Sequence, residues 1–304
     1  MRVGVVDAEG EIVYETTVPS QGLPQSALLE ALEHELRTAF ETRPDVRAAG
    51  VGIPCTIDRE RGVAIAAVNI ELADVPIRDL LTERIGLPVF IDNDANAAAL
   101  AEHRFGAARG ARNAVMLTIG TGIGGGLILD GRLYRGSTGA GAELGHTVIE
   151  AEGPRCQGNC PNRGCVESLA SGTALAREAL AVAERVPDSG LARVLDGGAN
   201  LEGREVTSAA LAGDEAAKRV LELIGRRIGV ALSSFANVFD PDVIVIGGGV
   251  SAAGELLVAP ARDELAARAL PPMNRTPVAV AALGPDAGMI GAATLARLEL
   301  EERR

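Results

Sequence analysis

Three of the chain's four cysteines lie close together, ten residues beyond a histidine. The segment GHTVIEAEGPRCQGNCPNRGCVES holds His146, Cys156, Cys160 and Cys165. Thiolates and a neutral imidazole are the ligands that zinc prefers in a closed tetrahedral site. A lone histidine is more often a buried core residue, but the chain has only three histidines. One of them beside the only cysteine cluster favours a Zn²⁺ site.

A carboxylate lies on each side of this cluster. Glu143 comes just before His146, and Glu167 comes just after Cys165. Carboxylates around a metal that already has four protein ligands do not need to bind it. The pattern therefore indicates a structural metal that shapes a polar pocket rather than one that does chemistry.

A second polar group follows a predicted strand at 89–91. Asp94, beside Asn93 and Asn96, would accept a proton from a substrate hydroxyl, and such a general base contributes about 10²–10⁴ in rate. The alternative is that Asp92 and Asp94 cap the helix predicted at 95–107, which is a very common role for aspartate. The segment by itself slightly favours the cap.

Three glycine-rich turns each follow a predicted strand. Glycine lets backbone N–H groups approach an anion closely, so such turns can hold phosphates. The first contains G-x-G-x-x-G but leads into a hairpin rather than a helix, which excludes a Rossmann site, and no G-x-x-x-x-G-K-[ST] loop is present. Singly each turn is more often structural, but together they favour nucleotide binding. The turns are 120–126, 247–249 and 284–288.

The elements that would position these groups alternate between strands and helices, which is typical of an α/β protein. The predicted strands are 2–7, 11–18, 48–53, 89–91, 114–119, 125–129, 243–246 and 278–283. The predicted helices are 24–40, 78–85, 95–107, a helical region over 174–236, and 287–301.

Composition narrows the classes of partner. A net charge of −12 and 2% aromatic residues argue against binding to nucleic acid or to an anionic membrane. No signal peptide and no apolar run of membrane-spanning length is visible. Clustered cysteines that remain free to bind metal fit a reducing cytoplasm, which is where we expect the protein.

The motifs, taken in order, resemble the ROK (repressor, open reading frame, kinase) family of sugar kinases, and within it the bacterial glucokinases. The resemblance spans residues 50–293. It rests on GIPCTID, AVNI, VFIDNDANAAALAE, LTIGTGIGGGLILDGRLYRG, AELGH, GCVESLASG, DPDVIVIGGGVS and GPDAGMIGAA.

The resemblance implies a two-lobed, actin-like (ribonuclease H-like) α/β fold. The small lobe would comprise 1–108 plus 287–304, and the large lobe 109–286. The active cleft would lie between them, and its closure on sugar would exclude water from the γ-phosphate.

The resemblance also implies a role for each motif residue. Asp94 is similar to the base that deprotonates the attacking sugar hydroxyl. The sugar ligands implied are Asn69, Asn93, Glu143, His146 and Glu167. The phosphate turn implied is Gly120, Thr121 and Gly122, the adenosine site is Gly247, Gly248 and Gly249, and the zinc ligands are His146, Cys156, Cys160 and Cys165.

The implied activity is ATP-dependent phosphorylation of glucose at its 6-hydroxyl, with Mg²⁺ bridging the phosphates. A kinase for another hexose or an N-acetylhexosamine is one alternative. An inactive sugar-binding or regulatory protein is another. The resemblance further implies a homodimer, and it leaves the phosphate donor open between ATP and polyphosphate.

The amino-terminal segment departs from the family pattern. Kinases of this family begin with a strand and a D-x-G-G-T turn that meets the β- and γ-phosphates. MRVGVVDAEGEIV is similar to the strand immediately after that turn. We therefore expect that first strand and turn to be missing from these 304 residues, and kinase activity to be weak or absent until they are restored.

Overall fold

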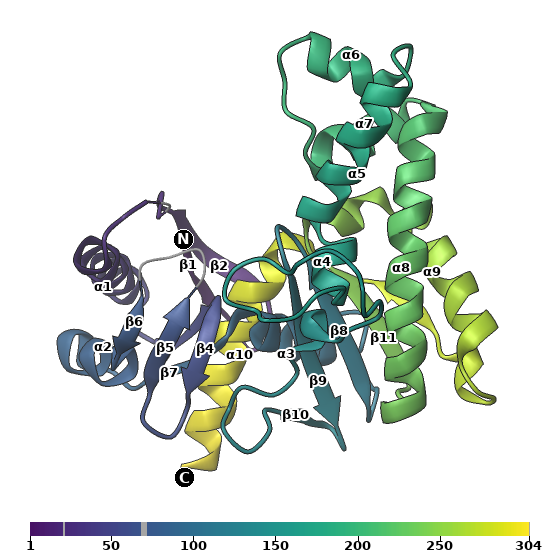
Figure 1. The fold of residues 1–304 in the computed structure, drawn as a ribbon. Helices are drawn as coiled ribbons and strands as arrows, with labels where there is room; N and C mark the ends of the chain where they lie inside the picture. Colours follow the sequence, from purple (N-terminus) through teal and green to yellow (C-terminus); the bar gives the residue numbers. More distant parts are fainter. Residues whose placement is uncertain (21, 68–71, 304) are drawn as a thin grey trace.

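The computed structural model describes residues 1–20, 22–67 and 72–303, and its fold is α/β (Figure 1). A group of small sheets lies at the amino-terminal side, and a five-stranded sheet with most of the helices lies at the other. The described part of the chain contains no helix long and apolar enough to cross a membrane.

Short strands make up the amino-terminal part. The antiparallel pair is β1 (Arg2–Val6) and β2 (Ile12–Thr17), and the parallel pair is β3 (Ala49–Ile53) and β7 (Val89–Asn93). The antiparallel sheet of β4 (Cys55–Asp58), β5 (Val63–Ala67) and β6 (Ala73–Val75) was not predicted. Two helices, α1 (Gln25–Thr42) and α2 (Ile77–Ile85), cover these strands, and α1 buries Leu28, Leu29, Leu32, Leu36 and Ala39.

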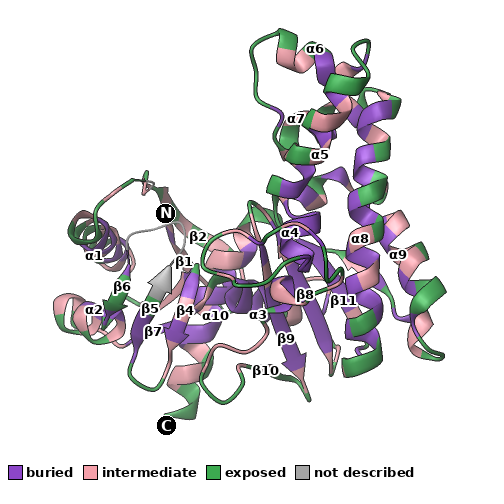
Figure 2. Ribbon diagram, viewed as in Figure 1, coloured by how far each residue is buried: buried purple, intermediate pink, exposed green. Residues whose placement is uncertain are grey.

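The larger sheet has the order β10-β9-β8-β11-β12. Its antiparallel half is β8 (Ala114–Ile119), β9 (Ile123–Leu129) and β10 (Arg132–Tyr134), and its parallel half adds β11 (Val243–Gly247) and β12 (Val278–Val280) to β8. Figure 2 shows β8, β9 and β11 as almost wholly buried. A strand that is apolar without alternation, such as VIVI at 243–246, is expected when both faces of a sheet are covered.

The helices around the larger sheet build the main core. The long helix α8 (Glu215–Phe239) packs against α9 (Glu255–Arg268), and its upper half joins α5, α6 and α7 in a helical group (Figure 1). In this group α5 spans Gly172–Arg185, α6 spans Gly190–Asp196 and α7 spans Gly203–Leu211, and the short helix α4 (Val166–Ala170) also packs against α8. The described residues also form the short 3₁₀ turns η1 (Leu144–His146), η2 (Gly249–Ala253), η3 (Met273–Arg275) and η4 (Gly284–Asp286).

Two helices from distant parts of the sequence lie at the centre of the molecule. The helix α3 (Asp94–Phe105) packs against the carboxyl-terminal helix α10 (Ala287–Glu302), and both line a separate apolar core against the larger sheet. The two helices approach so closely that a Cβ on Gly291 would lie 1.7 Å from the carbonyl oxygen of Ala97. Glycine at position 291 therefore allows the two helices to pack this closely.

A cavity of about 830 Å³ lies between β1 and β3. Among the described residues β1 pairs only with β2 and β3 pairs only with β7, so each strand has an open edge. Residues 1–6 and 48–53 line the cavity together, with α1 on one side and α10 on the other. The cavity therefore has a helix over each face and a strand at each edge, which are the surroundings that a central, apolar strand of a sheet has.

Candidate active site

The DND triplet 92–94 follows β7 directly and opens α3, and each residue has a different role. Asn93 is the N-cap, because its side chain accepts hydrogen bonds from the backbone N–H groups of Ala95 and Asn96. Asp92 is buried and Asp94 already belongs to the helix, so neither is the N-cap and the alternative prediction of caps at Asp92 and Asp94 is wrong. Asp94 is the first helical residue, and one of its carboxylate oxygens accepts from Ala95 N at 2.9 Å.

The carboxylate of Asp94 is exposed to solvent, yet protein surrounds it on most sides. This partial desolvation raises its pKa above the ordinary aspartate value, although backbone hydrogen bonds oppose the shift. The same surroundings affect Cys55, since burial and the nearby Asp94 charge raise the pKa of that thiol to about 12. A carboxylate with a raised pKa accepts a proton more readily, as a general base must.

Glu143 precedes the short turn η1, His146 is the last residue of that turn, and Glu143 lies near Asp94. Burial raises the pKa of Glu143, the Glu167 and Asp94 carboxylates raise it further, and His146 lowers it. The imidazole Nε2 lies 3.9 Å from a carboxylate oxygen of Glu143. Three carboxylates and one imidazole therefore share one electrostatic environment, although they are up to 73 positions apart in the sequence.

The other imidazole nitrogen of His146 faces the cysteines. Nδ1 lies 3.7 Å from the Cys156 sulfur, and one ligand atom from each of the four predicted residues lies within 4.8 Å of the others. Cys156 and Cys165 are buried, and burial raises the pKa of the Cys156 thiol. Three thiols and an imidazole converging at this spacing fit a tetrahedral zinc site. Cys156 lies together with the other three predicted ligands.

The cysteine-rich segment also contacts the first glycine turn. A carboxylate oxygen of Glu167 accepts from the backbone N–H of Ile123 at 2.8 Å, and the Gln157 amide donates to the carbonyl of Thr121 at 3.0 Å. A Cβ at Gly122 would lie 2.4 Å from the Glu167 carboxylate, so a side chain there would displace that carboxylate from the N–H of Ile123. The two hydrogen bonds join the glycine turn to the cysteine-rich segment.

Two of the three glycine turns lie at one edge of the larger sheet. Because β8 and β11 are parallel and pair Thr118 with Gly247, the turns that follow them leave the sheet side by side. The carboxyl ends of parallel strands are where α/β proteins bind ligands. The segment around Thr121 and the segment 247–249 therefore form one continuous rim.

A family model described as the ROK family matches residues 1–299. A glucokinase of Halalkalibacterium halodurans is 38% identical over 98% of this chain and 92% of its own length. The chain belongs to the ROK family. A crystal structure of a ROK family glucokinase from Streptomyces griseus, in complex with glucose and AMPPNP, matches with a TM-score of 0.85 and 37% identity, over 97% of this chain and 95% of that one.

Membership of the ROK family fixes the fold as that of the actin-like sugar kinases, as the motifs predicted. The family also contains regulators. A xylose repressor of Caldicellulosiruptor bescii is 31% identical over 78% of this chain, which covers 58% of the repressor.

The predicted site residues of this ROK protein converge to different degrees. Asp94, Glu143, His146 and Glu167 lie in one environment, whereas Asn69 lies outside the described residues. The Asn93 oxygen is occupied by the helix cap, and its amide lies 3.4 Å from the Cys55 carbonyl. Sequence reasoning missed Gln157 and Arg135, whose contacts join segments far apart in the chain.

Proposed function

We propose that this protein is a kinase that transfers the γ-phosphoryl group of ATP to the 6-hydroxyl of glucose. One observation carries the proposal. A partly desolvated carboxylate, Asp94, lies at a strand end in the same environment as Glu143 and His146, beside a segment that contacts the first glycine turn. A base, hydrogen-bonding groups for a polyhydroxylated substrate and a phosphate-type turn are what sugar phosphorylation requires.

The proposed reaction is a single displacement. The sugar oxygen forms a bond to the γ-phosphorus while the bond from that phosphorus to the bridging oxygen of ADP breaks. Asp94 accepts the proton that the hydroxyl loses. Positioning and charge neutralisation supply most of the rate in such reactions, so the geometry around Asp94 matters more than its basicity alone.

Sugar recognition falls to the groups around η1. The carboxylate of Glu143 accepts hydrogen bonds from hydroxyls, and His146 presents Nε2 toward Glu143 while Nδ1 faces the cysteines. A site built to bond particular hydroxyls rejects sugars that lack them, because its own polar groups would be left unpaired. We assign Asn93 and Glu167 to the same pocket, with Glu167 also supporting the glycine turn.

Two cofactors accompany this function. A zinc ion held by His146, Cys156, Cys160 and Cys165 would order the segment that carries the sugar ligands, and with four protein ligands it would leave no position for catalysis. Mg²⁺ would enter with ATP and neutralise phosphate charge. We assign Gly120, Thr121 and Gly122 to the phosphates and Gly247, Gly248 and Gly249 to the adenosine end of the rim.

A sugar-responsive regulator is the second candidate, and the similarity to a xylose repressor is the observation that favours it. A regulator needs the sugar pocket alone. The two candidates differ in turnover rather than in sugar binding.

The test is a sugar panel run twice. Calorimetry would measure binding of glucose, mannose, N-acetylglucosamine, N-acetylmannosamine and xylose, and a coupled assay would measure ADP release with each. Glucose binding with ADP release, and a product phosphorylated at the 6-position by NMR, is the expected result. Glucose or xylose binding without any ADP release would favour the regulator, and preferred turnover of another sugar would refute glucose.

A further inference from the structure

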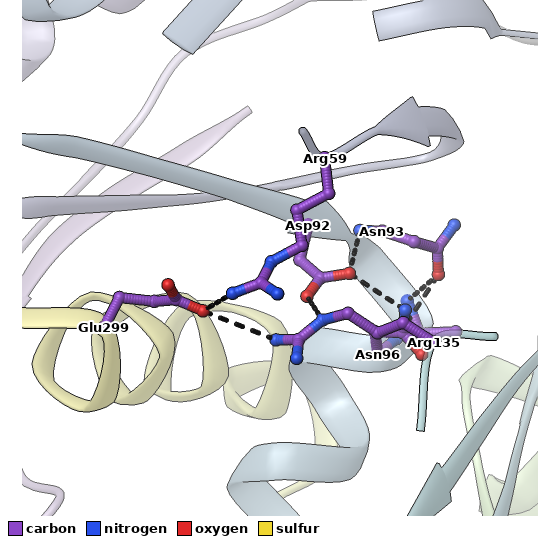
Figure 3. A network of polar contacts seen from close by, with 7 residues as sticks. Arg59, Asp92, Asn93, Asn96, Arg135 and Glu299 are labelled. Atoms are coloured by element: carbon purple, nitrogen blue, oxygen red, sulfur yellow. Dashed lines mark hydrogen bonds and ion pairs between the residues drawn. The ribbon is translucent and has the colours of Figure 1, made fainter. Parts of the chain in front are cut away.

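Asp92 lies two residues before the proposed base, and its carboxylate is buried and accepts hydrogen bonds through both oxygens. Asp92 is 2% exposed, and its oxygens accept from the backbone N–H of Asn93 at 2.8 Å, the Asn96 amide at 2.8 Å and Arg135 Nε at 2.6 Å (Figure 3). The first two contacts are local to the start of α3. The third comes from another part of the chain, 43 positions away.

Arg135 comes directly after β10, from the larger sheet, and its side chain is 17% exposed. Its Nη2 lies 4.0 Å from a carboxylate oxygen of Glu299 on α10, and Glu299 also pairs with Arg59. Figure 3 shows the guanidinium between the two carboxylates. The side chain thus joins the larger sheet to both β7 and the carboxyl-terminal helix.

The backbone of Arg135 extends the connection in the other direction. Its carbonyl accepts from Gly141 N at 2.8 Å, which closes the loop that leads to the sugar-binding turn. The next residue, Ala142, has a φ of +70°, and its carbonyl accepts from Leu144 N at 2.7 Å. A non-glycine residue in this left-handed conformation persists only where surrounding contacts hold it. Glu143 follows immediately.

We propose that Arg135 is a positioning residue that sets the proposed base Asp94 at the right place relative to Glu143 and His146. Its side chain fixes the strand end that carries Asp94, and its backbone fixes the loop that carries the sugar ligands. The inference rests on the proposed function and deepens it. Buried ion pairs are often no more stabilising than apolar residues of similar volume. We therefore expect the Asp92–Arg135 pair to fix the geometry of the site rather than to stabilise the fold.

The test compares Arg135→Met, Arg135→Lys and Asp92→Asn with the wild type at a temperature where circular dichroism shows each one folded. We expect Arg135→Met to lower kcat/KM for glucose about 100-fold, with changes in both kcat and KM, since a 1 Å misplacement has an effect of this size. Arg135→Lys keeps the charge but loses the planar fork, and should lose about tenfold. The double variant Asp92→Asn/Arg135→Met should be no worse than either single change, because the two residues act as a unit.

Arg112→Met is the matched control, since Arg112 makes an exposed ion pair with Asp130 and should keep wild-type constants. If folded Arg135→Met and Arg135→Lys keep kcat and KM within about twofold of wild type, the pair is merely structural and the proposal is overturned. If Arg135→Met does not fold, Arg135→Lys decides. A wild type that neither binds nor phosphorylates any hexose refutes the proposed function first, and this inference with it.

Discussion

Three consecutive polar residues at the start of α3 each make a different contact. Asp92 holds the ion pair with Arg135, Asn93 caps the helix, and Asp94 keeps a carboxylate oxygen available to substrate. Aspartate and asparagine are both good N-caps, so the residue types alone could not assign these roles. What decides them is the contact with Arg135, which no local pattern contains.

The environment of Asp94 predicts how activity depends on pH. A base works only when deprotonated, and burial raises the pKa of Asp94, so kcat should be full above that raised pKa and fall as the pH drops through it. The acid limb of the kcat profile should therefore lie above about pH 3.9, the pKa of an unburied aspartate. A profile measured from pH 4 to 8 that stays flat throughout would contradict this assignment.

Among the larger elements, the predicted helices and the strands predicted at 114–119, 125–129, 243–246 and 278–283 agree with the structure to within a few residues, because apolar runs bounded by glycine-rich or polar turns mark them. The short strand β10 was not among the predicted strands. The sheet of β4, β5 and β6 was missed. Its strands are short, and 63–67 is apolar without the alternation that indicates a half-buried strand. No helix was predicted over 255–268, where Pro260 interrupts a weak pattern.

The cysteine-rich segment is predicted to support both substrates. We expect about one zinc per chain, and we expect Cys165→Ser to lose zinc, to weaken glucose binding and to raise KM for ATP. The last effect follows because Gln157 in that segment bonds the carbonyl of Thr121. Metal analysis, calorimetry and steady-state kinetics would measure the three quantities.

Cys55→Ser is the matched control, because Cys55 is a free cysteine outside the cluster and its replacement should leave zinc content unchanged. Zinc-free protein with normal affinity for both substrates would refute the supporting role. Equal zinc loss in Cys55→Ser would refute the ligand assignment.

The cavity between β1 and β3 predicts the effect of an added strand. An extension ahead of Met1 that carries a short apolar strand and a D-x-G-G-T turn should pair with both open edges. Burying several apolar side chains contributes about 1.5–3 kcal/mol each, and 1 kcal/mol shifts Tm by roughly 2–4 °C at this size, so Tm should rise by at least about 5 °C. Kinase activity should rise as well.

A glycine–serine extension of equal length is the control for that experiment. It offers no apolar side chains to the cavity, so it should leave Tm and activity unchanged. If both extensions behave alike, the cavity does not accept a strand.

Over the whole molecule, the site exists because segments distant in sequence meet around α3 and α10. Strand ends at 92–94, the turn at 143–146 and the cysteines at 156–165 come together only through the packing of two sheets on these helices. The family resemblance could name most of these residues. It gave no role to Arg135, although a quoted motif (117–136) contains it, nor to Gln157, which lies outside the quoted motifs. The contacts of both residues join segments that are far apart in the sequence.

The identity of the base is best tested by comparing wild-type protein with Asp94→Asn at high enzyme concentration, with Mg²⁺, ATP and glucose. We expect NMR to detect glucose 6-phosphate with the wild type and about 10²–10⁴-fold less with Asp94→Asn, while calorimetry finds nearly equal glucose affinity. Asp130→Asn, an exposed aspartate elsewhere, should behave as wild type. Near-normal kcat in Asp94→Asn would contradict the account. So would the absence of any phosphorylated hexose both from the wild type and from the wild type extended by the apolar strand and D-x-G-G-T turn.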